Sequence, residues 1–270
     1  KGIAWQAMHN NPVSNAFIVH DLKVISETAE RLGKKADADR YRRQMEATTE
    51  AYIRKFVSKK GIVAKDYQSA YIMALKFVLP EGELREQVKK NFAANIRKNG
   101  LQTGFFATEH LLPLLVEAGE TELAYDILLQ EGCPGWMYQV KCGATTTWER
   151  WDALKPDGTV NEEKMAGSGD NMVSFNHYAF GSVGEFYYQY ILGIKPQKPG
   201  FAELHFEPYP DRRLGGVSGS YLSRAGKIES SWKYEEDGCH ISLNTPVKSE
   251  VVLPDGKKET VEAGTYQWLC

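Results

Sequence analysis

The sequence is poor in cysteine, has no long apolar run and carries almost no net charge. Its four cysteines are too few and too scattered for a disulfide scaffold, and none forms the CxxC pair typical of zinc sites. No uninterrupted apolar stretch approaches the roughly 18 residues that a membrane span needs. Lys and Arg number 33 against 35 Asp and Glu, so the basic excess of a nucleic-acid binder is absent. We therefore expect neither a nucleic-acid nor a membrane partner.

What the chain does contain is ordinary globular composition with many aromatic rings. Apolar residues make up 42% and charged residues 25% of 270 residues, which suits one large domain or two smaller ones with a real core. Six Trp and fourteen Tyr are typical of enzymes that hold sugars on flat rings. For Cys133 and Cys142 the sequence leaves two states open, a pair or two buried free thiols.

The first two thirds of the chain predict consecutive helices. In the first helix, apolar residues recur at three-to-four spacing and Gly33 stands where a C-terminal cap belongs. That stripe comprises Ile18, Leu22, Ile25, Ala29 and Leu32. Short links between helices predict antiparallel hairpins in a bundle, solenoid or closed toroid, and the absence of a fixed repeat disfavours the solenoid. The predicted helices span 14–32, 36–56, 68–79, 84–96, 111–118, 122–130 and 176–192.

After Pro196 the pattern changes to the alternation of strands bounded by Gly, Pro and Asp. A helical block followed by a strand block predicts two domains, at residues 1–195 and 196–270. We expect the second to be an antiparallel sandwich with one buried face per strand. The residues predicted to point inward are Leu204, Phe206, Ile228, Trp232, Ile241, Leu243 and Val252.

The long linker before the seventh helix is the candidate site. It contains Trp148-Glu149-Arg150-Trp151, in which two aromatic rings flank a carboxylate. Flat rings stack on pyranose faces while a carboxylate moves a proton, so this pattern fits sugar hydrolysis. The alternative is a surface pair of Glu149 with Arg150, with both tryptophans closing the core.

Four longer segments favour the first interpretation by resemblance. The segments GATTTWERWD, SFNHYAFGSVGEFYYQYILGI and PGFAELHFEPYP occur in that order, and LQTGFFATEHLLPLLVEAGETELAYDILLQEGCPGWMYQV precedes them. Together they resemble the second half of the α-L-rhamnosidases of glycoside hydrolase family 78. The resemblance implies a mainly α fold with a β domain: the later helices of an (α/α)6 toroid followed by an antiparallel β-sandwich.

The resemblance also implies roles for particular residues in an inverting hydrolysis of terminal α-L-rhamnose. Glu149 matches the general base and His177 a substrate-contacting histidine. One of Trp148 and Trp151 is expected to line the sugar pocket and the other to pack beneath it, in an order that the sequence leaves open. Trp5 stands where many members of the family carry a GDW motif, although the sequence here is GIAW and lacks the Asp. Further barrel positions typical of the family are Gln68 and the Thr103-Gly104-Phe105 turn, with Glu109 and His110 beside it.

The family's general acid belongs to an Asp/Arg/Glu-rich motif that this sequence lacks, and seven predicted helices are fewer than the toroid's twelve. We therefore expect a C-terminal fragment, inactive alone, whose partners are a carbohydrate with terminal rhamnose and either the missing N-terminal half of the barrel or a second copy. No cofactor or metal is implied, because two carboxylates and water suffice. Alternatives are another (α/α)6 carbohydrase with a different sugar, or a non-catalytic sugar-binding or structural module. Secreted, periplasmic and cytoplasmic locations all stay open.

Overall fold

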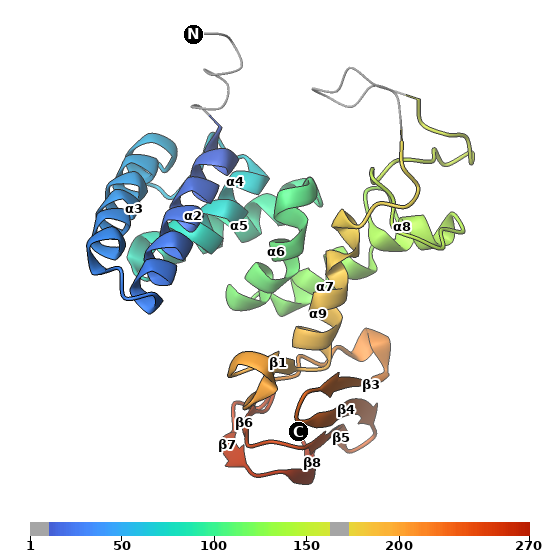
Figure 1. Ribbon diagram of the computed structural model, residues 1–270. Helices are drawn as coiled ribbons and strands as arrows, with labels where there is room; N and C mark the ends of the chain where they lie inside the picture. Colours follow the sequence, from blue (N-terminus) through green and yellow to red (C-terminus); the bar gives the residue numbers. More distant parts are fainter. Residues whose placement is uncertain (1–10, 163–172) are drawn as a thin grey trace. The chain divides into compact units, whose positions relative to one another are not determined.

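The computed structural model describes residues 11–162 and 173–270, so Trp5 lies outside the described residues. The chain forms two compact units, one that ends at Phe180 and one that comprises Gly181–Cys270. Helices make up the first unit and strands most of the second (Figure 1), as the sequence predicts. The domain boundary predicted between residues 195 and 196 lies within the second unit. The division into domains at that point stays a prediction.

The helices of the first unit follow the predicted ones closely, with one addition. They are α2 (Pro12–Arg31), α3 (Lys35–Phe56), α4 (Gln68–Met73), the π-helical turn η1 (Ala74–Val78), α5 (Glu83–Asn99), α6 (Phe105–Glu117), α7 (Thr121–Leu129) and α8 (Trp136–Lys141). Helix α6 begins six residues before the predicted start, and α8 was not predicted. Among the described helices, none is both long and apolar enough to cross a membrane.

Helices α2 and α3 form the first hairpin, visible side by side in blue in Figure 1. Asn11 begins α2, because its Oδ1 accepts hydrogen bonds from the backbone N–H groups of Val13 and Ser14 at 2.9 and 3.3 Å. The buried face of α2 includes Ser26, whose hydroxyl donates to the carbonyl of Ala38 on α3. The apolar stripe predicted from the sequence is only partly buried: its exposed members are Ile18 at 47%, Ile25 at 43% and Leu32 at 67%.

Helices α4 and α6 form the core of the first unit. Every residue of α4 is buried, and so are six consecutive residues of α6, 111–116. Helix α4 continues into η1, whose last turn closes with a bond from the N–H of Leu79 to the carbonyl of Ala74 at 2.8 Å. Pro80 cannot continue a helix, so the chain leaves there. Where α6 begins, the chain carries Thr103, Gly104 and Phe105, which line the candidate site described below.

The second unit opens with short irregular helices, where the sequence predicts one long helix over 176–192. They are η2 (Ala179–Ser182), α9 (Val183–Phe186) and η3 (Tyr187–Ile191). Two four-stranded sheets follow, in the orders β1-β2-β6-β7 and β3-β4-β5-β8. The strands are β1 (Ile194–Pro196), β2 (Leu204–Phe206), β3 (Gly216–Ser223), β4 (Gly226–Glu235), β5 (Gly238–Thr245), β6 (Ser249–Val252), β7 (Lys258–Val261) and β8 (Gly264–Leu269).

Strand pairing is antiparallel except between β2 and β6, which run parallel. Six of the seven residues predicted to point inward are buried. The exception is Val252, which is half-buried while its neighbour Val251 is fully buried. The prediction for Val252 was wrong by one residue, because β6 continues the alternation of Ser249, Val251 and Leu253, all of which are buried.

Candidate active site

The candidate site is a pocket of about 580 Å³ in the first unit. Its walls come from the loop before α6, the loop before α8 and the linker that follows α8. Two carboxylates, one guanidinium and several aromatic rings meet there. The lining residues are Thr103, Gly104, Phe105, Cys133, Pro134, Glu149, Arg150, Trp151, Asp152 and Phe180.

Two linker segments that the sequence singles out lie against each other and shape this pocket. The backbone N–H of Glu149 donates to the carbonyl of Ser174 at 2.9 Å, and that of His177 donates to the carbonyl of Thr147 at 2.9 Å. The hydroxyl of Thr147 donates in turn to the carbonyl of His177 at 2.6 Å. The WERW segment and the SFNHY segment are therefore joined as a ladder without forming a regular strand.

Glu149 is held in place by this ladder. Its Oε2 accepts a hydrogen bond from the backbone N–H of Ser174 at 2.8 Å, which fixes the carboxylate plane. No hydrogen bond joins its second oxygen, Oε1, to any of the described residues. A carboxylate that lines a pocket and has one oxygen anchored is well placed to take a proton.

The two tryptophans of the motif have different places. Trp151 lines the pocket, while Trp148 is 3% exposed and packs with Tyr138 and Ala153 beneath the loop. The backbone N–H of Trp148 also donates to the side-chain Oε1 of Gln139 on α8 at 3.1 Å. Trp151 is thus the pocket member of the predicted pair, and Trp148 is the one that packs below.

Trp151 belongs to a set of rings that we call the aromatic wall: Trp136, Trp151, Phe180, Phe105 and His177. Trp151 stacks on Phe180 with ring centroids 3.7 Å apart and an angle of 8°, and meets the edge of Trp136 at 5.0 Å. Phe105 contacts Phe180 at 5.7 Å and stacks on His177 at 4.6 Å.

Hydrogen bonds fix the aromatic wall at both ends. The indole N–H of Trp136 donates to the carbonyl of Phe180 at 2.8 Å, and that of Trp151 to the carbonyl of Thr103 at 3.0 Å. His177 does not line the pocket itself but supports Phe105, which does.

The second carboxylate of the pocket, Asp152, is engaged as an acceptor. Its two oxygens accept from Nε and Nη2 of Arg150, each at 3.0 Å, and Oδ2 also accepts from the amide of Asn161 at 2.8 Å. Both oxygens of Asp152 are thus occupied as acceptors, in a two-point contact with the guanidinium of Arg150. Asp152 therefore orients Arg150 and does not suit the role of general acid.

Cys133 is the other reactive group in the pocket wall. All four cysteines are free thiols, and Cys133 is exposed, contrary to the expectation of buried thiols. Although Cys133 is exposed, partial desolvation by its neighbours raises the pKa of its thiol, and the negative charge of Asp152 raises it further. The thiolate is the nucleophile, so this environment disfavours nucleophilic chemistry at Cys133.

Beneath the pocket, a buried amide pair anchors the loop that carries Phe105. Gln68 accepts from the backbone N–H of Gln102 at 2.8 Å and donates to the carbonyl of Gly100 at 2.9 Å and to Oδ1 of Asn95 at 3.2 Å. Asn95 donates to the carbonyl of Asp66 at 2.9 Å. Sequence reasoning marked Gln68 but missed Asn95, because a lone Asn in a helix pattern gives no signal of long-range pairing.

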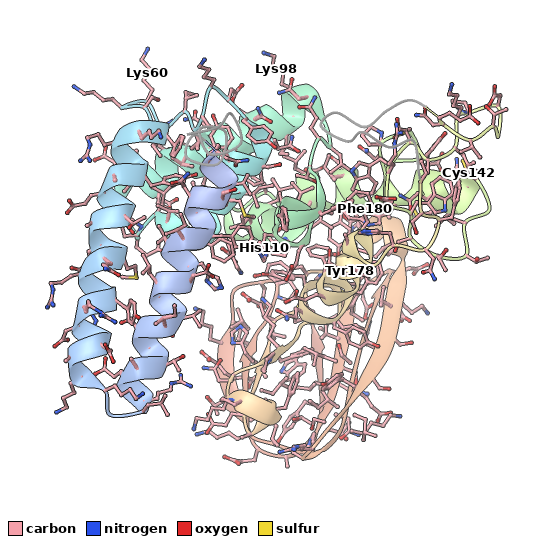
Figure 2. All side chains as sticks on the ribbon, turned by 45° about the horizontal axis from the view of Figure 1, so that its top comes forward. Lys60, Lys98, His110, Cys142, Tyr178 and Phe180 are labelled. Carbon is pink, nitrogen blue, oxygen red and sulfur yellow. The ribbon has the colours of Figure 1, made fainter. Side chains whose placement is uncertain are left out.

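Glu109 and His110 point elsewhere than the described pocket lining. His110, labelled in Figure 2, meets the edge of Phe77 at 5.6 Å. Burial lowers the pKa of His110 to about 4, with Lys76 and His20 adding to the effect. A neutral histidine among aromatic rings is a packing group in this position.

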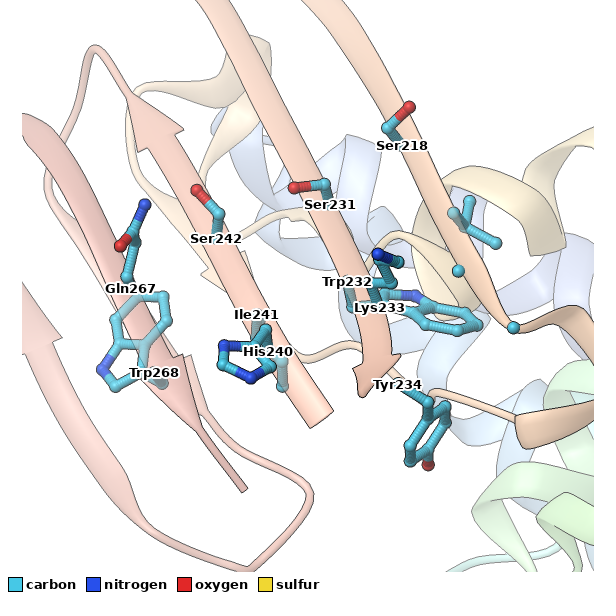
Figure 3. A pocket seen from close by; sticks show the side chains of 13 residues that line it. Ser218, Ser231, Trp232, Lys233, Tyr234, His240, Ile241, Ser242, Gln267 and Trp268 are labelled. Carbon is cyan, nitrogen blue, oxygen red and sulfur yellow. The ribbon is translucent and has the colours of Figure 1, made fainter. Parts of the chain in front are cut away.

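The second unit has a larger hollow, of about 670 Å³, on the β3-β4-β5-β8 sheet (Figure 3). Ser218, Ser231, Ser242 and Gln267 form a row across its four strands. No carboxylate is among the described residues that line it, so it lacks the pair of carboxyl groups that glycoside hydrolysis uses.

Within the described residues, one set of side chains is close enough to share a metal ion. Glu235, Asp237 and His240, near the β4–β5 turn, offer ligand atoms within 4.8 Å of one another. They are exposed, and Lys233 already pairs with Glu235 at 2.9 Å. We assign no metal to them.

Helical hairpins that carry an aromatic pocket around a fixed carboxylate, followed by a β-sandwich, define a carbohydrate-active class of protein. The family model of the bacterial α-L-rhamnosidase six-hairpin glycosidase domain matches residues 5–191. The model of the bacterial α-L-rhamnosidase C-terminal domain matches residues 193–267. The chain belongs to the bacterial α-L-rhamnosidase family, and the predicted fold class is confirmed.

Individual relatives agree with this assignment. The chain is 35% identical to an α-L-rhamnosidase of Alteromonas sp. (strain LOR) over 90% of its length, and 32% identical to one of Streptomyces avermitilis over 93%. Its fold is similar to the native α-L-rhamnosidase of Aspergillus terreus (TM-score 0.86, 30% identity, 95% of this chain and 30% of that one).

The S. avermitilis enzyme solved in complex with L-rhamnose is similar to the same degree (TM-score 0.85, 30% identity, 94% of this chain and 26% of that one). The chain spans about a quarter of the length of the curated relatives, 26% and 24% for the two named above.

Proposed function

We propose that this chain supplies the general-base side of an inverting α-L-rhamnosidase. The observation that carries the proposal is the Glu149 carboxylate, anchored by the N–H of Ser174 at 2.8 Å inside a pocket lined by Trp151 and Phe105. Family membership supports rhamnose as the sugar, since the related S. avermitilis enzyme is described in complex with L-rhamnose.

In this proposal Glu149 removes a proton from a water molecule that attacks the anomeric carbon. The bond from that carbon to the leaving oxygen breaks while the new bond to the water oxygen forms on the opposite face, and the configuration inverts. A carboxylic acid roughly 6.5–9.5 Å from Glu149 protonates the leaving oxygen. Asp152 does not serve as that acid, because it is paired with Arg150. We propose that the acid comes from another part of the barrel.

In this scheme the pocket-lining rings of the aromatic wall hold the sugar, and His177, which supports Phe105 from outside the described lining, adds a hydrogen bond to a sugar hydroxyl. Trp151 offers a flat ring face to pyranose C–H groups. His177 accepts a hydrogen bond at Nδ1 from the backbone N–H of Ala179 at 3.3 Å, which places the proton of the neutral ring on Nε2. That N–H can donate to a sugar hydroxyl, as the sequence predicts for His177.

The direct test is Glu149→Gln in the assembled enzyme, with the rest of the barrel present. Glutamine keeps the shape and cannot take the proton, so kcat on an aryl α-L-rhamnoside is expected to fall about 10²–10⁴-fold, while rhamnose binding persists. The matched control is Glu131→Gln, a surface carboxylate paired with Lys141, which is expected to have no effect. Near-normal turnover of Glu149→Gln overturns the assignment.

We also propose that the exposed stripe of α2, formed by Ile18, Ile25 and Leu32, packs against helices of the same barrel that precede this sequence. The family model describes six hairpins, and the described part of the first unit holds seven α-helices, α2 to α8. A sequence pattern that predicts a buried face, yet is exposed here, marks a surface that another helix covers.

Light scattering tests this surface. The chain mixed with the preceding barrel segment is expected to form a one-to-one complex, and Ile25→Asp is expected to weaken it, whereas Lys23→Asp on another face of α2 is not. If the chain stays a monodisperse monomer and forms no complex with the preceding segment, the proposal is contradicted. Self-association without such a complex assigns the stripe to a second copy instead.

A further inference from the structure

The aromatic wall continues beyond the pocket to an exposed ring. Tyr178, labelled with Phe180 in Figure 2, lies parallel to His177 with centroids 5.5 Å apart and an angle of 10°. His177 is itself stacked on the pocket-lining Phe105 at 4.6 Å and 20°. Phe105, His177 and Tyr178 therefore form a ladder of three nearly parallel rings, which we call the ring ladder.

Tyr178 is the solvent end of the ring ladder. Its side chain is 87% exposed, the highest value among the large hydrophobic residues that are exposed in the described part of the chain. An exposed aromatic ring gains little from folding, so packing alone does not account for it. Its free face is parallel to the rings that lead into the pocket.

The backbone on both sides of Tyr178 is fixed, so the point from which its ring projects is set before any ligand binds. His177 exchanges two hydrogen bonds with Thr147, from its N–H at 2.9 Å and to its carbonyl at 2.6 Å. Ala179 donates its N–H to the His177 ring at 3.3 Å. With the backbone set, only the two side-chain torsions of the tyrosine remain to be ordered when the ring stacks on a ligand.

We propose that Tyr178 is a stacking platform for the part of the substrate that leaves, a flat pyranose or aromatic ring attached to rhamnose. The proposal rests on the proposed function, because it takes the pocket as the site of the terminal rhamnose. With rhamnose inside, the group linked to it extends toward solvent, and the ring ladder likewise leads from the pocket-lining Phe105 to the exposed Tyr178. Stacking on an exposed ring needs only a flat face, so either kind of ring fits.

The test compares three substrates of the assembled enzyme. Rhamnosyl fluoride carries no ring beyond the sugar, 4-methylumbelliferyl α-L-rhamnoside carries an aromatic ring, and rhamnosyl-glucose carries a pyranose. Tyr178→Ala is expected to raise KM about 3- to 10-fold for one or both ring-bearing substrates relative to the fluoride. The two ring-bearing arms distinguish an aromatic from a sugar leaving group. Tyr178→Phe keeps the ring and is expected to restore the lost affinity.

The matched control is Tyr67→Ala, an exposed tyrosine outside the pocket lining, which is expected to leave all three substrates unaffected. Equal losses on all three substrates for Tyr178→Ala, or no loss on any, overturn the platform. The first of these results is what is expected if another polypeptide segment covers Tyr178. If the wild-type enzyme cleaves none of the three, the proposed function fails instead, so the two failures are distinguishable.

Discussion

The side chains that line the hollows of the two units are positioned in different ways, by strand pairing in one and by loops in the other. In the second unit, strand register places each side chain, and the row of Ser218, Ser231 and Ser242 is regular because β3, β4 and β5 pair without interruption. In the first unit, the pocket is made of loops, and single hydrogen bonds such as that from Ser174 to Glu149 position the groups. The regular surface carries no carboxylate in its described hollow, whereas the irregular one does.

Catalytic groups are expected in the irregular region, because loops can bring side chains from distant parts of the sequence close together. Thr103, Glu149 and His177 are far apart in the sequence, and no single helix or strand brings them together. The cost is that each position depends on a few specific bonds. The sheets are expected to tolerate surface changes that the loops do not.

The largest expected effect is on the core of the sheets. Trp232 is 2% exposed, and its indole N–H donates to the carbonyl of Ile191 at 2.7 Å. Trp232→Ala is expected to lower the free energy of unfolding by about 3–5 kcal/mol, because it leaves a cavity and an unpaired carbonyl. Denaturant unfolding measures this loss. Lys233→Ala, on the exposed face of the same strand, is the control. A loss below about 1 kcal/mol for Trp232→Ala would show that this residue is not central to the core.

A smaller effect is expected from the amide pair beneath the pocket. Gln68→Ala removes three hydrogen bonds and leaves the N–H of Gln102 and the carbonyl of Gly100 without that partner, at an expected cost of about 1–3 kcal/mol. Because these groups anchor the loop to Phe105, sugar affinity is expected to fall as well. The exposed Gln87→Ala is the control. Unchanged stability and affinity would show that the loop is held by other contacts.

The smallest effect is a pH dependence in the second unit. His205 and Lys195 hold the pKa of Glu207 down to about 2, with a hydrogen bond from Tyr209 adding, although burial opposes them. Glu207 at 3.2 Å raises the pKa of His205 despite burial, and Glu250 on the other side adds to it. This cluster is half-buried, so the energies are modest.

The signs of the two pKa shifts follow from linkage. The depressed pKa of Glu207 contributes stability that is present above its unfolded pKa, about 4.3, and is lost as pH falls toward about 2. The raised pKa of His205 contributes stability that is full below about 6.5 and is lost as pH rises through the folded value. We expect a loss of about 1–2 kcal/mol between pH 5 and pH 2 that is smaller in Glu207→Gln. Thermal unfolding across pH checks this, and identical profiles would contradict it.

Sequence patterns predicted the long amphipathic helices well and the irregular ones poorly. Helices α2, α3 and α5 match their predicted ranges to within a few residues because their apolar spacing is clear. Helix α6 starts before its predicted range because residues 105–110 mix apolar and polar side chains without a three-to-four apolar spacing, and the continuous buried run begins only at Leu111. The helix predicted over 176–192 begins at Ala179 and runs to Ile191, but as successive 3-10, α and π turns, the last of which closes with a bond from the N–H of Leu192 to the carbonyl of Tyr187.

Tertiary pairing explains the strands that the sequence did not reveal. Strand β3 is rich in Gly and Ser, yet it pairs with β4 along its whole length, so its partner and not its own propensity makes it a strand. For the site, the motifs pointed to Glu149, Trp151 and His177, and the structure adds what motifs cannot carry, namely the partners of each group.

The central claim is that Glu149 acts as a base toward water in an inverting reaction. Chemical rescue tests it most directly, because azide attacks the anomeric carbon without needing deprotonation. In the assembled Glu149→Gln enzyme with an aryl α-L-rhamnoside, azide is expected to restore turnover and to give the glycosyl azide of inverted configuration, identified by NMR. A retained glycosyl azide, or Glu149→Gln turnover at the normal rate without azide, would contradict the claim.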